Sequence, residues 1–356
     1  MNTEIIKIDE ENMDMQAIGR AGEIIKTGGL VAFPTETVYG LGGDALNAAS
    51  SEKIYVAKGR PSDNPLIVHI AKLEELSFLV REVPEVAYKL AEKFWPGPLT
   101  MIFHKSKEVP AKTTGGLETV AVRMPSNKVA KAFIEAAGGY VAAPSANRSG
   151  RPSPTVAKYV IEDLDGRVEM ILDGGEAVIG LESTIIDLTE EKPVILRPGY
   201  VTEEMLESVI KNVEVDRAII DEACYKAPKA PGMKYRHYAP KGDLTIVEGQ
   251  AQQVEAYINE QLKECKTEGK KTGVIATDET AMHYQADSVK SAGGRNEKEQ
   301  IAKHLFRILR EFDDEDVQVI YAESFEKQGV GAAIMNRLLK AAGHRIVSLD
   351  QDKNKV

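Results

Sequence analysis

Short apolar runs alternate with helical patterns along the first two-thirds of the chain. Runs rich in Val, Ile and Leu, bounded by Gly, Pro or Asp, predict strands at 30–33, 66–70, 120–123, 140–143, 170–172, 184–187 and 194–196. Helices are expected between many of them, at about 14–27, 50–58, 84–94, 127–137 and 155–164. Ser126 is the expected N-cap of the fourth helix, and Gly138 is its expected stop. This alternation indicates a sheet with helices packed on it.

A second α/β pattern occupies the C-terminal third. It predicts strands at 244–247, 272–276, 317–321 and 345–349, with helices near 251–265, 297–311 and 332–342. Asn296, followed by Glu299, is the expected N-cap of the middle helix, and Gly343 ends the last one. Because strands and helices alternate, we expect a parallel, Rossmann-like three-layer unit of about 105 residues.

Residues 225–242 separate the two patterns and have a different composition. They contain three prolines, five Lys or Arg and no acidic residue, which is typical of an extended segment. A passive linker is one interpretation. The segment also holds more aromatic and polar chemistry than a tether needs, in Tyr225, Met233, Tyr235, His237 and Tyr238. We therefore expect a catalytic domain at 1–210, a linker or lid at 211–242 and a smaller domain at 243–356.

Composition narrows the class of protein. The 356 residues are 43% hydrophobic and 28% charged with a net charge of −10, as in a soluble globular protein with a sizeable core. Two cysteines, Cys224 and Cys265, cannot form a disulfide framework, so we expect a reducing, cytoplasmic location. Acidic residues in the first ten positions argue against a signal peptide, and no apolar run approaches the roughly 20 residues of a membrane span.

Charge is unevenly distributed. Residues 101–160 hold nine Lys or Arg and three acids, whereas residues 161–210 hold three and thirteen. A general nucleic-acid binder usually presents a dominant basic face, so one basic segment fits a pocket for a polyanionic small molecule better. Solvated helix faces of opposite sign explain the same counts equally well.

Common nucleotide and metal motifs are missing or weak. There is no G-x-x-x-x-G-K-[ST] segment, and residues 34–37 separate the first strand from Gly40-Leu41-Gly42-Gly43-Asp44-Ala45, so a Gly-rich turn is favoured over a dinucleotide site. Gly329 and Gly331 could hold an anion before the last helix, although close packing is the commoner reason for such glycines. The histidines are not at metal-ligand spacing, so we expect no structural zinc. His69 lies in an apolar run, which by itself favours a core histidine.

Compact polar segments at the ends of the predicted strands carry the candidate chemistry. They cover 34–41, 58–65, 123–125, 144–152, 182–184 and 196–199. Ligands of open α/β sheets lie beyond strand ends, so these loops are candidate walls of a site. Lys58, Arg60, Arg123 and Arg197 can pair with phosphate or carboxylate. Together they predict a substrate that carries phosphate.

The same segments resemble a known family. Pro34-Thr35-Glu36-Thr37-Val38-Tyr39-Gly40-Leu41, the pair Lys58/Arg60, Asn64-Pro65-Leu66, Trp95-Pro96-Gly97-Pro98-Leu99-Thr100, Ala121-Val122-Arg123-Met124-Pro125 and Pro144-Ser145-Ala146-Asn147 match the YrdC/Sua family. The resemblance covers roughly residues 10–210, and the linker with the C-terminal domain resembles the long, two-domain members. It implies a twisted, open, mixed α/β sheet with a positively charged concave face. The implied activity joins L-threonine, bicarbonate and ATP into threonylcarbamoyl-AMP and pyrophosphate, for the threonylcarbamoyladenosine modification of tRNA.

The resemblance also implies site residues. L-Threonine is expected near Thr35, His69, Arg123, Ala143 and Ser183, which reverses the core interpretation of His69. ATP is expected near Lys58, Arg60, Asn64, Ser145, Asn147, Arg197 and Tyr238, with Lys58 and Arg60 in the catalytic role. Mg²⁺ would accompany ATP, and the expected partners are downstream tRNA threonylcarbamoyl-transfer proteins, with a weak RNA contact in addition.

Two other functions remain open from the residues. The basic segment 101–160 would also suit an RNA-binding or ribosome-assembly module, although the net charge of −10 and the lack of aromatic-basic strand motifs count against it. Carbamoyl transfer from carbamoyl phosphate is the other alternative. No Ser–His–Asp arrangement or carboxylate pair is identifiable, so no general base is predicted. The linker is expected to close over the site, with Tyr238 against the nucleotide and Lys234 or Arg236 near its phosphates.

Overall fold

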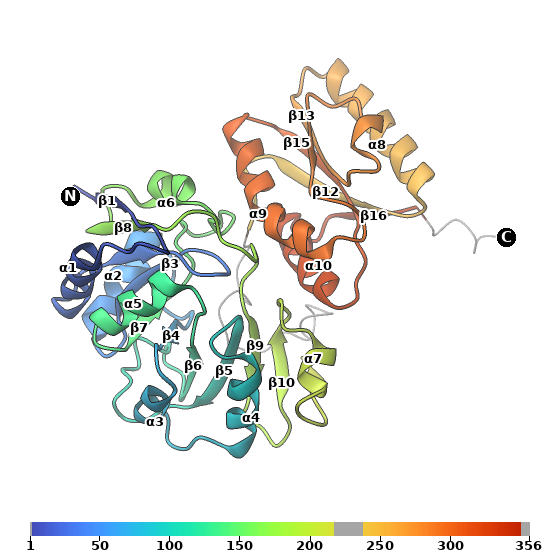
Figure 1. Cartoon of the computed structure of the whole chain (residues 1–356). Helices are drawn as coiled ribbons and strands as arrows, with labels where there is room; N and C mark the ends of the chain where they lie inside the picture. The colour runs from blue at the N-terminus through green and yellow to red at the C-terminus, as the bar shows by residue number, and fades with distance from the viewer. Residues whose placement is uncertain (1, 217–237, 350–356) are drawn as a thin grey trace. The chain divides into compact units, whose positions relative to one another are not determined.

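The computed structural model describes residues 2–216 and 238–349. The chain divides into two compact units, Met1–Ser149 with Ser153–Tyr235, and Gly150–Pro152 with Arg236–Val356. Each unit is built on its own sheet (Figure 1). The predicted class, a mixed sheet with helices plus a smaller parallel α/β domain, is confirmed.

The first unit has a mixed sheet, in which eleven strands belong to the described residues. Their order is β1-β8-β2-β3-β7-β4-β6-β5-β9-β10-β11, and both parallel and antiparallel pairs occur. The strands are β1 (Glu4–Lys7), β2 (Val31–Phe33), β3 (Gly40–Asp44), β4 (Ile67–His69), β5 (Leu99–His104), β6 (Thr119–Arg123), β7 (Val141–Ala143), β8 (Met170–Asp173), β9 (Thr184–Asp187), β10 (Val194–Arg197) and β11 (Glu214–Val215).

Helices cover both faces of the N-terminal part of this sheet. On one face α1 and α5 enclose a core with Val31 and Phe33, and on the other α2, α4 and α6 enclose a core with Ala32. Neighbouring strand residues point to opposite faces, so β2 is buried on both sides. The helical elements are α1 (Met15–Lys26), α2 (Ala48–Lys58), η1 (Leu73–Glu75), α3 (Leu76–Leu79), α4 (Glu85–Phe94), α5 (Lys128–Ala136), α6 (Ala157–Leu164) and α7 (Glu203–Glu207).

The glycine-rich stretch after the first polar loop is a strand, so the predicted Gly-rich turn is wrong. β3 pairs antiparallel with β2, and its glycines lie against bulky neighbours. A Cβ on Gly40 would come within 2.9 Å of the Phe33 ring, and one on Gly42 within 2.8 Å of Val141. The glycines are needed because the strand packs closely against these side chains. The local sequence pattern does not reveal this packing.

Other predicted elements agree with the structure except at specific boundaries. The strands β1, β5, β11 and β14 and the short helical elements η1, α3, α7 and η4 were not predicted. The N-cap of α5 is Asn127, whose side chain accepts a hydrogen bond from the Ala130 amide at 2.9 Å, so the assignment to Ser126 is wrong. The predicted cap Asn296 is also wrong, because α9 is preceded by Glu297.

The second unit contains a sheet whose strands are all parallel, in the order β14-β13-β15-β12-β16. Helix α8 covers one face, and α9 and α10 lie together on the other (Figure 1). The elements are β12 (Asp243–Glu248), α8 (Ala251–Thr267), β13 (Thr272–Ala276), η4 (Ala281–His283), β14 (Ser288–Ser291), α9 (Lys298–Asp314), β15 (Val319–Glu323), α10 (Val330–Ala341) and β16 (Ile346–Ser348). A Cβ on Gly331 would lie 2.0 Å from the Glu326 carbonyl oxygen, so close packing explains this glycine.

The short segment 150–152 clusters with the second unit, where α9 holds it. The buried Arg310 guanidinium donates from Nε and Nη2 to the Pro152 carbonyl oxygen at 3.0 and 2.8 Å. Asp313 lies 3.6 Å from Arg151 and accepts a hydrogen bond from the Lys241 amide. This segment comes directly after the polar loop that contains Ser145 and Asn147.

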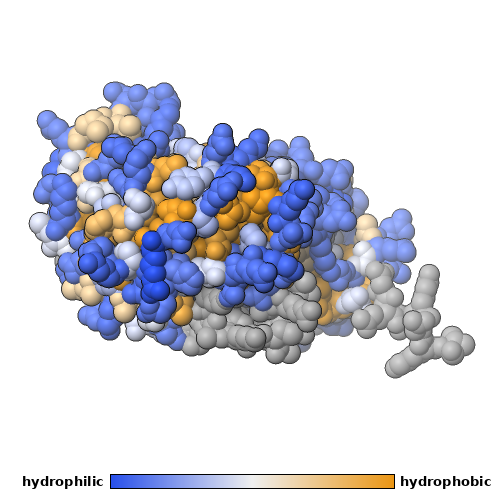
Figure 2. Space-filling model, turned by 90° about the horizontal axis from the view of Figure 1, so that it is seen from below, coloured by the Kyte–Doolittle hydropathy of each residue, from blue (hydrophilic) through white to orange (hydrophobic). Residues whose placement is uncertain are grey.

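The molecular surface is mostly polar at the rim of the face shown in Figure 2, with apolar residues gathered between the hydrophilic ones. Within the described residues, no helix is long and apolar enough to cross a lipid bilayer.

The corrected cap of α5 gives a first prediction. Asn127→Ala removes the acceptor for the Ala130 amide and should destabilise the protein by about 1 kcal/mol. Ser126→Ala is the matched control and should change the free energy of unfolding by less than about 0.5 kcal/mol. Urea denaturation of both variants measures the difference, and equal losses would contradict the assignment.

Candidate active site

Three polar side chains lie in a row across neighbouring strands of the first sheet. His69 ends β4, Arg123 ends β6 and Thr100 is on β5, and the register pairs Arg123 with both of the others. Residues paired in register point to the same face of a sheet, so the row shares one face. All three residues are buried. A polar row inside a sheet requires partners from elsewhere, and two loops supply them.

The first partner is Glu36, from the loop after β2. Its Oε1 atom lies 2.8 Å from Arg123 Nη2, and the two side chains are only 8% and 5% exposed. The contact is not aligned as a hydrogen bond, and Nε and Nη2 of Arg123 and both carboxylate oxygens of Glu36 have no hydrogen-bond partner within the described chain. Buried charged atoms of this kind are costly unless a ligand satisfies them.

The loop that presents Glu36 is held by its own hydrogen bonds. The Thr35 hydroxyl donates to the Val38 carbonyl oxygen at 2.6 Å and lies 2.9 Å from the Thr37 hydroxyl. The Ile179 amide donates to the Glu36 carbonyl oxygen at 2.8 Å. Thr35, predicted to contact threonine, therefore shapes the loop in this structure.

Ser183 and Arg197 form the second group beside the row. Ser183 Oγ lies 2.7 Å from the Thr100 hydroxyl, and Arg197 donates to Ser183 Oγ at 3.1 Å and to its carbonyl oxygen at 3.0 Å. Gly199 allows this arrangement, because a Cβ there would lie 2.4 Å from the Thr184 amide nitrogen. Ser183, predicted for threonine, and Arg197, predicted for ATP, are thus in direct contact.

Lys58, Ser145 and Asn147 form a third group. The Lys58 ammonium, at the end of α2, donates to the Ser145 and Asn147 carbonyl oxygens and reaches Asn147 Oδ1 at 3.3 Å. Ser145 Oγ also donates to Asn147 Oδ1. The predicted ATP residues of this set are therefore brought together. In this arrangement Lys58 positions the 145–147 loop.

The first and third groups are linked through the Glu36 loop. The Ala146 amide donates to the Tyr39 carbonyl oxygen at 2.8 Å, and the Leu41 amide to the Pro144 carbonyl oxygen at 2.9 Å. An isolated antiparallel β-bridge also pairs Gly40 with Ser145. The loop that carries Glu36 is therefore bonded directly to the loop that carries Ser145 and Asn147.

The loop after α2 supplies Arg60 and Asn64. Arg60 Nη2 lies 3.4 Å from the Pro65 carbonyl oxygen. Asn64 is fully buried, and neither polar atom of its side-chain amide has a hydrogen-bond partner within the described residues. An amide left in this state is suited to a polar ligand group.

His69 is neutral in the folded protein. Burial, and after it the Arg123 guanidinium, lower the pKa of His69 to about 3, although hydrogen bonds to the Ile67 and Val141 backbone oppose the change. Its Nδ1 lies 3.1 Å from the Ile67 carbonyl oxygen, so Nδ1 carries the proton. His69 can therefore offer a neutral imidazole to a ligand.

Two predicted residues stand apart from these contacts. Ala143 is buried at the end of β7, with its neighbour Ala142 paired to Val68 of β4. Tyr238 belongs to the second unit, where its ring stacks on Phe306 at 5.0 Å and Arg337 lies over it at 5.9 Å. The position of Tyr238 over a nucleotide stays a prediction. Lys234 and Arg236 lie outside the described residues.

Sequence reasoning missed two members of the site. Glu36 belongs to the polar loop 34–41 and Thr100 to the motif 95–100, but neither is among the predicted site residues. An acid between two threonines after a buried strand is a weak signal. Only the tertiary structure shows that Glu36 faces Arg123 and that Thr100 faces Ser183.

The combined arrangement suits a small molecule that carries a positive and a negative charge. Arg123 and Arg197 offer cationic donors and Glu36 offers an acceptor, while Lys58 ends α2 and Asn64 and Asn147 lie on two further polar loops. Among the described residues, no three His, Cys, Asp or Glu side chains are grouped to hold a metal ion.

Fold and site together define an α/β protein with a buried polar site for a charged small molecule. Residues 23–199 match the Sua5_yciO_yrdC family model, described as "Telomere recombination", and residues 201–343 match "Threonylcarbamoyl-AMP synthase, C-terminal domain". The chain belongs to the Sua5/YciO/YrdC family, with both domains of its long members, and the predicted resemblance is confirmed.

Relatives match over nearly their whole length. The chain is 50% identical over 339 residues to the threonylcarbamoyl-AMP synthase of Pyrococcus abyssi, covering 95% of this chain and 98% of the relative. It is 48% identical over 340 residues to that of Bacillus subtilis, covering 95% and 96%. The crystal structure of P. abyssi Sua5 complexed with L-threonine has a TM-score of 0.92 at 49% identity, covering 98% and 100%.

The Glu36–Arg123 pair generates a stability prediction. Arg123→Gln leaves the buried Glu36 charge uncompensated and should destabilise the protein by about 3–5 kcal/mol. The double variant E36Q/R123Q removes both charges and should recover most of that loss. Urea denaturation measures both.

An exposed pair serves as the control for that experiment. Arg81 and Glu118 are 2.9 Å apart with side chains 61% and 75% exposed, and Arg81→Gln should cost at most about 1 kcal/mol. A double variant less stable than Arg123→Gln would show that the pair does not behave as a buried ion pair.

His69 predicts a pH dependence. The unfolded chain takes up a proton at this residue as the pH falls below about 6.5, whereas the folded protein does so only near pH 3. His69 therefore lowers the free energy of unfolding by about 2 kcal/mol between about pH 8 and pH 5, with stability lost on acidification. His69→Asn should remove that part of the slope in denaturation curves. The exposed His104→Asn is the control, and an unchanged slope in His69→Asn would refute the assignment.

Proposed function

We propose that this chain makes threonylcarbamoyl-AMP and pyrophosphate from L-threonine, bicarbonate and ATP, as a step in the threonylcarbamoyladenosine modification of tRNA. The observation that carries the proposal is the buried Glu36–Arg123 pair beside Ser183 and Thr100. L-Threonine is a zwitterion with a hydroxyl. Its carboxylate suits Arg123, its ammonium suits Glu36, and its hydroxyl suits the Ser183 and Thr100 pair.

The neighbouring loops support the nucleotide part of the proposal. Lys58, Arg60 and Arg197 supply positive charge for a triphosphate, and the unsatisfied amide of Asn64 supplies both a donor and an acceptor. Arg197 touches Ser183, so an α-phosphate beside Arg197 would lie close to a bound threonine. The full-length relatives named threonylcarbamoyl-AMP synthase, and the relative crystallised with L-threonine, support the same assignment.

The proposed reaction proceeds in two steps. The amine nitrogen of threonine bonds to the carbon of bicarbonate with loss of water, giving an N-carboxylate. One of its oxygens then attacks the α-phosphorus of ATP, and the bond to pyrophosphate breaks. Positioning and neutralisation of developing charge are the protein's main contributions to a transfer of this kind. Glu36 lies where it could receive the proton that the ammonium of threonine must lose.

Mg²⁺ is proposed to enter bound to the phosphate oxygens of ATP, and cationic side chains would screen the remaining charge. A cytoplasmic location and delivery of the product to tRNA threonylcarbamoyl-transfer proteins belong to the same proposal. The site does not support RNA binding by the basic segment 101–160. Arg123, which belongs to that segment, is buried against the sheet and is not on the surface.

Pyrophosphate release by the full chain tests the proposal. Release should require L-threonine, bicarbonate and ATP together, and the adenylate product should appear by mass spectrometry. Valine lacks the hydroxyl and should be used at least about 100-fold less well, whereas serine lacks only a methyl group, worth about 1 kcal/mol. Arg81→Gln is the matched control variant and should retain wild-type turnover. Pyrophosphate release without threonine, or carbamoyl phosphate replacing bicarbonate and ATP, would reject it.

A further inference from the structure

A pocket lies in the second unit, among residues to which the proposed reaction assigns no role. Its volume is about 260 Å³, slightly below the usual range of small-molecule sites, about 300–1,000 Å³. Its walls come from the segments that follow four of the parallel strands. The lining residues are Gly249, Ala251, Val254, Thr280, Arg295, Glu323 and Ser324.

The position of the pocket in the sheet is the one that α/β proteins use for ligands. β12 and β15 are neighbours, and the chain leaves β12 through α8 toward β13 but leaves β15 through α10 toward β16, on the other side. The two helices cover opposite faces, so the crevice at the carboxyl ends of β12 and β15 is a topological switch point. Gly249 and Ala251 follow one of these strands, whereas Glu323 ends the other and Ser324 comes directly after it.

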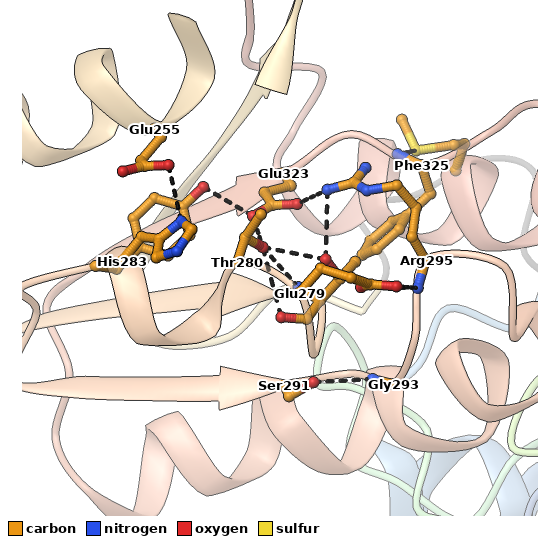
Figure 3. A network of polar contacts seen from close by, with 12 residues as sticks. Glu255, Glu279, Thr280, His283, Ser291, Gly293, Arg295, Glu323 and Phe325 are labelled. Atoms are coloured by element: carbon orange, nitrogen blue, oxygen red, sulfur yellow. Dashed lines mark hydrogen bonds and ion pairs between the residues drawn. The ribbon is translucent and has the colours of Figure 1, made fainter. Parts of the chain in front are cut away.

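Glu323 anchors a polar network at this point (Figure 3). Its side chain is 3% exposed, and its Oε1 accepts hydrogen bonds from the Tyr284 hydroxyl at 2.7 Å and from the Thr280 hydroxyl. Its Oε2 is paired with Nη2 of Arg295. Burial, and after it the charge of Glu323, raise the pKa of Tyr284, which keeps the hydroxyl protonated as a donor.

Arg295 is thereby fixed with part of its guanidinium unused. Its Nη2 contacts Glu323 and lies 3.4 Å from Thr277, whereas Nε and Nη1 make no hydrogen bond with the described residues. The side chain is 41% exposed and lines the pocket. Ser324, on the facing strand end, likewise has a side-chain hydroxyl without a hydrogen bond in the described structure. The pocket therefore combines unused donors with a buried, fixed carboxylate.

The first turn of α8 also favours a negatively charged ligand, but more weakly than Arg295 does. Its N-cap residue, Gln250, makes no capping hydrogen bond from its side chain, and Ala251 begins both the helix and one wall of the pocket. Amides at a helix N-terminus favour negative charge. This contribution reinforces the guanidinium of Arg295 and does not replace it.

We propose that this pocket binds a small metabolite that carries an anionic group, phosphate or carboxylate, next to a hydroxyl. Arg295 and Ser324 receive the anion, and Oε2 of Glu323, which is bonded to Arg295 alone among the described residues, accepts a hydrogen bond from the hydroxyl. The volume fits a molecule the size of a hydroxy acid or a sugar phosphate. The pocket is independent of the reaction proposed for the first unit.

Isothermal titration of the full chain with sn-glycerol 3-phosphate, D-glycerate and inorganic phosphate tests the proposal. We expect saturable binding of one of the two hydroxylated probes, and their comparison distinguishes phosphate from carboxylate. Arg295→Gln should weaken that binding by about 10- to 150-fold. Arg345→Gln is the matched control, because Arg345 is 43% exposed and pairs with Asp243 at 2.9 Å away from the pocket; it should bind like the wild type.

Arg295→Gln leaves the buried Glu323 charge without its partner and could fail to fold. The variant R295Q/E323Q keeps the site neutral and should also lose binding while retaining a cooperative thermal transition. Equal binding by the wild type and a folded R295Q or R295Q/E323Q variant would overturn the proposal. Failure of the wild type to bind either hydroxylated probe at about 10 mM would overturn it as well. Neither result bears on pyrophosphate release from threonine, bicarbonate and ATP.

Discussion

The buried ion pair between Glu36 and Arg123 is the interaction on which the proposed active site depends. An arginine at the end of a central strand keeps its charge, and burying that charge without a partner costs several kcal/mol of desolvation. Glu36 supplies the partner and in doing so ties the loop after β2 to the face of the sheet. The pair is incompletely hydrogen-bonded, so the charge that holds the loop is also available to a zwitterionic substrate.

Backbone hydrogen bonds connect that loop to the residues proposed to bind the nucleotide. Tyr39 accepts a bond from Ala146, and the loop of Ser145 and Asn147 is closed against α2 by the Lys58 ammonium. The groups proposed to bind two different substrates are therefore parts of one hydrogen-bonded assembly. Pre-organisation of this kind is what a transfer reaction needs when positioning is the main source of rate.

The second unit uses buried charge in the same manner. Arg310 is buried with two hydrogen bonds to one carbonyl oxygen, and it fixes the segment 150–152. Glu323 is buried with three donors and fixes Arg295. In each case a charged group removed from water orders the chain or side chain that satisfies it. Buried charged groups and the partners that satisfy them thus fix parts of the chain in both units.

The sequence by itself determined the succession of elements and the identity of the polar loops. Buried strands such as 66–70 and the helix that ends at Gly138 follow from local apolar pattern and stop signals, which act within a few residues. The motif segments also identified the family, and they predicted most of the side chains assigned to the proposed site. What pattern could not determine is any contact between distant residues.

Tertiary structure alone decided which of these side chains face each other. Glu36 could be selected only once the fold brought the loop after β2 against Arg123, and Thr100 only once β5 lay between β6 and β9. Gly40 to Asp44 form a strand that pairs with β2, and Phe33 and Val141 leave no room for a side chain at Gly40 and Gly42. The pocket of the second unit was missed because strand β15 extends to Glu323, two residues beyond its predicted end. Pairing with neighbouring strands sets such ends, and that energy comes from residues far away in the chain.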